Sequence, residues 1–94
     1  MVYSVQQIKF EALMYIKEFG GKAEEWRVGV AADAPAALFG DNAVDAERDI
    51  WFWKPALSPA AARTVYQYMT QQFRVPPVEG ATEGNCVFLF KKAA

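Results

Sequence analysis

The chain has 94 residues and a formal net charge of −1, and its 53% hydrophobic content is too high for a disordered segment. It contains no histidine, which excludes the commonest general base, the Ser-His and Cys-His nucleophile pairs and most transition-metal sites. A single cysteine, Cys86, excludes an internal disulfide and favours a reducing compartment. We therefore expect one domain over residues 1–94, without a metal ion or a cofactor.

The N-terminus favours a cytoplasmic protein. Residues 1–4 carry no basic segment ahead of an apolar run, so they do not resemble a signal peptide. No apolar run approaches the ~20 residues that span a bilayer, and we expect no contact with membranes.

Residues 5–19 are predicted to form a helix that begins after Ser4, its N-cap, and ends at Gly20-Gly21. The core-facing stripe at helical spacing consists of Val5, Ile8, Ala12, Tyr15, Ile16 and Phe19. A second apolar set lies on the opposite side and consists of Tyr3, Phe10 and Met14. Either these three residues contact a partner or a second copy of the chain, or the helix is sandwiched inside the monomer.

Alternating residues predict a half-buried strand over residues 25–31, and a short helix follows. Asp33 is the expected N-cap of that helix, which runs to Phe39 and stops at Gly40. After a polar loop, Ile50-Trp51-Phe52-Trp53-Lys54 is predicted to be a strand closed by Pro55. This strand is apolar on both faces, because successive side chains point to opposite sides.

Ser58-Pro59 begins the clearest helix, expected over about residues 59–74. Residues 75–85, which are rich in proline and glycine, are predicted to form a loop. The last strand, Cys86–Phe90, is apolar on both faces and fits a central position in a sheet.

The expected fold is α+β, with three helices, a three-stranded, mostly antiparallel sheet and the chain order αβαβαβ. Two strands that are apolar on both faces need cover on both sides. Either helices flank both faces, or two subunits pack face to face, and the surplus of aromatic residues favours a homodimer. We expect Phe10→Glu or Met14→Glu to give a folded monomer.

The residue types favour a protein without catalytic activity. Ser4 and Ser58 are expected to be helix caps, and Cys86 begins an apolar strand with no histidine to activate it. A single glycine, Gly29, precedes the helix capped by Asp33, which argues against a phosphate site and for close packing at the strand.

The leading interpretation is a small binding or interaction domain. Its contact surface would come from the aromatic strand or from Tyr3, Phe10 and Met14. The alternative is a small-molecule-binding protein or enzyme, with an aromatic pocket lined by Trp51, Trp53 and Tyr66 and polar anchors among Arg27, Asp33 and Arg63. A third interpretation, binding of single-stranded nucleic acid on the tryptophan face, is disfavoured by the net charge of −1.

Residues 26–67 resemble part of the GIY-YIG nuclease domains. Arg27-Val28-Gly29 stands where that family has its Tyr-Ile-Gly-like tripeptide, and Ser58–Tyr66 is similar to the later helix that carries a metal-binding glutamate. Ala36 or Ala37 occupies the place of the catalytic arginine, and Tyr66 or Gln67 that of the glutamate. The first strand of the family is absent. The resemblance therefore implies an inactive relative that keeps the fold for binding.

Overall fold

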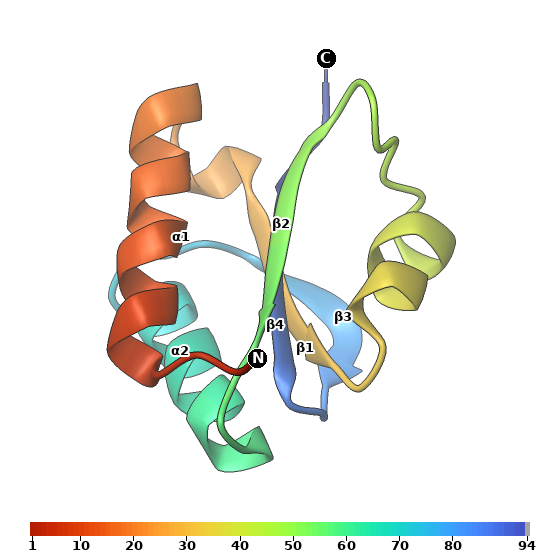
Figure 1. Ribbon diagram of the computed structural model, residues 1–94. Helices are drawn as coiled ribbons and strands as arrows, with labels where there is room; N and C mark the ends of the chain where they lie inside the picture. The colour runs from red at the N-terminus through yellow and green to blue at the C-terminus, as the bar shows by residue number, and fades with distance from the viewer. Residues whose placement is uncertain (94) are drawn as a thin grey trace.

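The computed structural model describes residues 1–93, apart from the side chains of residues 81 and 82. It confirms an α+β fold with helices and one sheet (Figure 1). The helices α1 (Val5–Phe19) and α2 (Pro59–Gln71) lie on one face of the sheet, and a short π-helix, η2 (Ala36–Asp41), lies on the other. A single 3₁₀ turn, η1 (Ala23–Glu25), precedes the first strand.

In the part of the chain that the structure describes, the sheet has four strands: β1 (Arg27–Ala31), β2 (Ile50–Pro55), β3 (Pro77–Thr82) and β4 (Cys86–Lys91). Their order is β2-β4-β1-β3. β4 runs antiparallel to both of its neighbours, while β1 and β3 are parallel. The expected three-stranded, mostly antiparallel sheet was therefore wrong in strand number, and the sheet is mixed.

The missed strand is β3, in the segment predicted to be a loop. Pro77 and Gly80 argue against a strand interior, but β3 lies at the edge of the sheet, where a proline costs no ladder hydrogen bond when it faces outward. The Val28 amide donates to the Pro76 carbonyl at 3.2 Å, and the β1–β3 register shifts between Val28 and Val30. β3 is a short and irregular edge strand.

The predicted caps are present. Ser4 and Gln7 form a reciprocal capping box, with the Gln7 amide donating to Ser4 Oγ at 3.2 Å. The Ala61 amide donates to Ser58 Oγ at 3.1 Å, and the Ala36 amide to Asp33 Oδ1 at 3.1 Å. α2 ends earlier than expected, and Arg74 adopts a positive φ of 62° shortly after it.

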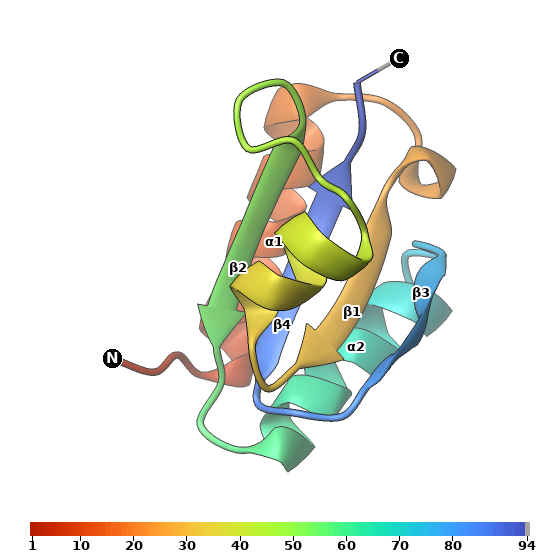
Figure 2. The ribbon, with the colours of Figure 1, turned by 90° about the vertical axis from the view of Figure 1, so that its right-hand side faces the viewer.

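Each face of the sheet carries its own core. Under α1 and α2, the central residues include Ile8, Trp26, Val28, Phe52, Val65, Met69 and Leu89. Under η2 and the segment after it, the core includes Ala34, Leu38, Val44, Val78, Phe88 and Phe90. Figure 2 shows η2 in front of β2 and β4, so the chain itself covers much of the second face. A face-to-face dimer was expected because one face of the sheet would otherwise lack cover, and that reason does not hold.

Candidate functional site

The free edge of β2 is the most distinctive surface of the fold. β2 is the first strand in the sheet order, so within residues 1–93 only β4 pairs with it along its length. The Ala56 amide donates to the Asn85 carbonyl of the segment before β4, and Tyr3 donates to the Pro55 carbonyl from the opposite side. Because hydrogen-bonding direction alternates along an antiparallel strand, Phe52 and Lys54 bond toward β4. The N–H and C=O groups of Trp51 and Trp53 therefore point away from the sheet.

On the η2 side of this edge lie two half-buried tryptophan side chains. Trp51 and Trp53 pair in register with Phe90 and Phe88 and pack against the second core. Trp51 meets Phe39 of η2 edge-to-face, with ring centroids 4.9 Å apart, and its Nε1 donates to the Ala46 carbonyl at 3.1 Å. These contacts hold Trp51 in place while part of its surface stays open to solvent.

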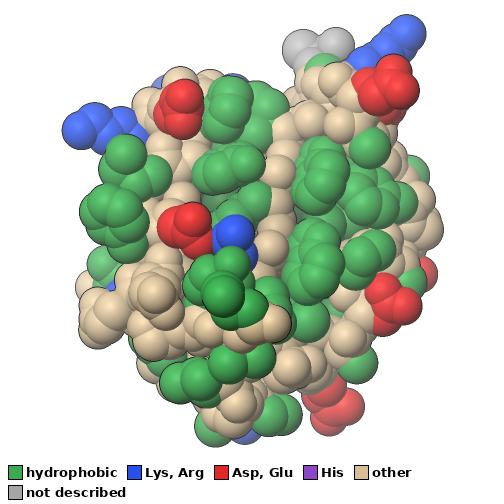
Figure 3. Space-filling model, in the orientation of Figure 1, with side chains coloured by type: hydrophobic (Ala, Val, Ile, Leu, Met, Phe, Trp, Pro, Cys, Tyr) green, Lys and Arg blue, Asp and Glu red, His purple; other side chains and the backbone are tan. Residues whose placement is uncertain are grey.

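On the α1 side, Tyr15 stacks on Phe52 with ring centroids 4.8 Å apart, and Phe19 lies at the same groove. The groove runs beside β2 with a volume of about 480 Å³. Lys54 closes its far end, with Nζ 3.7 Å from Glu11 Oε2 and 4.8 Å from the centroid of the Tyr3 ring. Figure 3 shows the result as a strip of backbone over β2 between hydrophobic side chains on both sides.

Both ends of the free edge are closed by the chain. At the C-terminal end of β2, Tyr3 forms a parallel bridge to Ala56. At its N-terminal end, Asp49 accepts hydrogen bonds from the Ala93 and Asp45 amides at 2.7 and 2.8 Å. These donors hold the pKa of Asp49 below the ordinary carboxylate value. The open stretch is thus residues 50–54.

The opposite edge of the sheet differs from β2. β3 begins with a proline, contains Gly80 at a positive φ of 76°, and carries an exposed Glu79. Prolines, charges and irregular geometry are the usual means by which edge strands avoid unwanted pairing. β2 has a regular register with β4 through all six residues and has only one charged side chain, Lys54.

The structure does not bring the residues of the expected aromatic pocket together. Tyr66 packs with the core under α1 and α2, whereas Trp51 and Trp53 lie against the other core. Arg63 is exposed on α2, and Arg27 is exposed on β1. Of the expected interface residues, Phe10 is 65% and Met14 46% exposed, and Tyr3 is half-buried beside β2.

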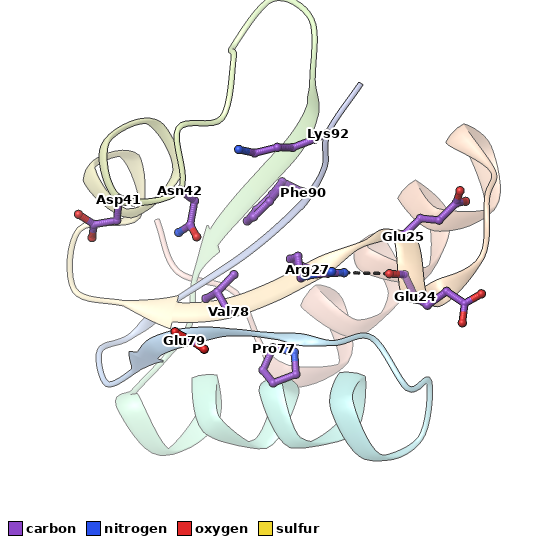
Figure 4. A pocket seen from close by; sticks show the side chains of 10 residues that line it. All are labelled: Glu24, Glu25, Arg27, Asp41, Asn42, Pro77, Val78, Glu79, Phe90 and Lys92. Atoms are coloured by element: carbon purple, nitrogen blue, oxygen red, sulfur yellow. Dashed lines mark hydrogen bonds between the residues drawn. The ribbon is translucent and has the colours of Figure 1, made fainter. Parts of the chain in front are cut away.

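A polar hollow of about 770 Å³ lies over β1 and β3, where η2 does not cover the sheet. Its lining, shown in Figure 4, consists of Glu24, Glu25, Arg27, Asp41, Asn42, Pro77, Val78, Glu79, Phe90 and Lys92. Arg27 Nη1 donates to the carbonyls of Glu24 and Trp26, both at 2.8 Å. Neither tryptophan of β2 lines this hollow.

The cysteine and serine side chains that could act as nucleophiles have structural roles. Cys86 is buried, and burial raises the pKa of its thiol, which keeps it protonated near neutral pH. Both serines named above cap helices. Within residues 1–93, no group of three or more cysteine or acidic side chains is placed to hold a metal ion.

Comparison with known proteins gives no match to a family model, a curated protein or a solved structure. None of the helices described for residues 1–93 has the length and apolar character needed to cross a membrane.

Proposed function

We propose that the protein is a non-catalytic interaction domain that binds an extended polypeptide segment along the free edge of β2. One observation carries the proposal: Trp51 and Trp53 direct their backbone groups outward, between hydrophobic side chains on both faces. A strand added to such an edge gains main-chain hydrogen bonds, and the flanking side chains select its alternate residues. The resemblance to an inactive GIY-YIG nuclease domain fits this proposal but stays a prediction.

The aromatic-pocket alternative has less support. A small-molecule site needs convergent walls with a few polar anchors, whereas Tyr66 and the tryptophans pack on opposite faces of the sheet. The groove beside β2 is long and open and follows a strand, which suits an extended chain.

Selection of ten-residue peptides from a random displayed library on the immobilised protein tests the proposal. We expect the selected peptides to alternate apolar and polar residues, because alternate side chains of an added strand face the same side. Their affinity should fall about tenfold or more for Trp53→Pro relative to Trp53→Ala, since only the proline removes an outward N–H.

Leu57→Glu is the control, because Leu57 is 64% exposed but lies beyond the closed end of the edge. Peptides whose binding is unaffected by Trp53→Pro, or the absence of any selected peptide for a wild type that is monomeric, would contradict the proposal.

A further inference from the structure

We propose that the polypeptide bound at this edge is a second copy of the chain. In this arrangement, β2 pairs antiparallel with β2 of the other copy about a two-fold axis that passes through Phe52. The inference rests on the function proposed above and specifies its partner. The product is a continuous sheet across two subunits, with one α1 from each copy on the same face.

The free backbone groups of β2 are arranged symmetrically about Phe52. Trp51 and Trp53 lie one residue on either side of Phe52, and their N–H and C=O groups point outward. An antiparallel pair centred on Phe52 places Trp51 of each copy opposite Trp53 of the other as hydrogen-bonded pairs. Every free group of both tryptophans then has a partner, without any shift in register.

The open stretch of β2 has the same centre. Tyr3 closes the edge at Pro55, and the turn held by Asp49 closes it before Ile50. The open residues, 50–54, are centred on Phe52, so the closed ends do not overlap when two copies pair about that residue. A register centred nearer Pro55 would drive one copy into Tyr3 of the other, and a register centred nearer Ile50 would drive it into the turn held by Asp49.

An exposed apolar side chain of α1, Met14, lies close to the proposed axis. Tyr15 stacks on Phe52, so the part of α1 around Tyr15 lies level with the proposed axis. Met14 precedes Tyr15 and lies one helical turn after Glu11, which contacts Lys54 at the β2 edge. An added peptide strand would leave the exposed Met14 uncovered, whereas a second copy brings another α1 beside it.

The side-chain pairing in this register is also favourable. Phe52 meets Phe52 of the second copy, and the tryptophans of both copies gather on the η2 side. Aromatic pairs directly across an antiparallel pair are stabilising, and like charges there are destabilising. Lys54, the one charged residue of the strand, falls opposite the apolar Ile50, so no like charges face each other across the pair.

Sedimentation equilibrium of the full chain, from about 1 to 500 micromolar, tests the inference. We expect the wild type and Leu57→Glu to form dimers with the same dissociation constant. For Trp53→Pro the dissociation constant should be about tenfold or more above that of Trp53→Ala, because two interchain hydrogen bonds are lost per dimer. Met14→Glu should raise it by about the same factor, since two carboxylates would meet near the axis.

Circular dichroism at low concentration shows whether each variant is folded. If the proline variant unfolds, Met14→Glu still tests the interface, because it lies on an exposed helix surface. A wild type that stays monomeric to 500 micromolar would overturn the inference. If peptides selected from the library still bind at Trp53, only the second-copy partner is wrong. If they do not, the proposed function fails as well. A dimer unaffected by both Trp53→Pro and Met14→Glu would place the interface elsewhere and also overturn the inference.

Discussion

Gly29 is the residue at which the packing of the second core depends most directly on a missing side chain. A Cβ atom at this position would lie 2.5 Å from Phe88 Cζ and 2.6 Å from Val78 Cγ2. Phe88 is fully buried, so its ring has little room to move. The close packing predicted for Gly29 from the sequence is therefore confirmed.

We expect Gly29→Ala to lower the free energy of unfolding by about 1–3 kcal/mol through overpacking. Gly40→Ala is the matched control, because no atom that the structure describes lies within 4 Å of a Cβ there. Its free energy of unfolding should be unchanged or raised by up to about 1 kcal/mol. Urea denaturation of the three proteins measures both changes. Equal stabilities for the two variants would contradict the packing around Gly29.

At the scale of elements, the alternation of hydrogen bonding along β2 can be tested with prolines. Pro55 already occupies an outward position of this strand. Trp53 is also outward, so Trp53→Pro and Trp53→Ala should have nearly the same monomer stability. Lys54 bonds toward β4, so Lys54→Pro should be less stable than Lys54→Ala by about 1–3 kcal/mol, because the Val87 carbonyl loses its donor.

Thermal or urea unfolding measures both differences, at a concentration at which sedimentation shows each protein to be monomeric. A larger penalty for proline at Trp53 than at Lys54 would show that the outward and inward positions are reversed. The tryptophans would then bond to β4, and the surface proposed for binding would not exist.

Local sequence signals predicted the helices better than they predicted the sheet. Ser4, Asp33 and Ser58 are cap residues whose partners lie three positions away, so short-range chemistry is enough to identify them. β3 was missed because Pro77 and Gly80 are tolerated only at an edge, and edge position depends on long-range strand order.

The same limit applies to the candidate site. The strand Ile50–Trp53 is apolar on both faces, which predicted that both faces would be covered. Both are covered in the structure. This pattern did not indicate that β2 lies at the edge. The helical stripe that contains Tyr66 predicted a buried face, but periodicity does not say which side of the sheet the helix covers. The expected grouping of Tyr66 with Trp51 and Trp53 failed to form for that reason.

At the scale of the whole molecule, the two edges of the sheet contrast. The β3 edge carries proline, an exposed acidic residue and a shifted register, whereas the β2 edge is regular and aromatic. An unprotected edge is a liability for a monomer unless a partner covers it. The second copy proposed here would cover that edge and the exposed Met14 of α1 in one interface.

Amide hydrogen exchange of β2, followed by NMR at about 5 and 500 micromolar, shows whether the β2 edge is open in the monomer and pairs with a second copy. In the dilute monomer we expect the Trp51 and Trp53 amides to exchange fast and those of Phe52 and Lys54 slowly, because only the latter bond to β4. At the higher concentration the tryptophan amides should become slow as well. Tryptophan amides that stay fast at 500 micromolar would contradict the pairing with a second copy. Tryptophan amides that are slow in a protein shown to be monomeric would contradict the open edge itself.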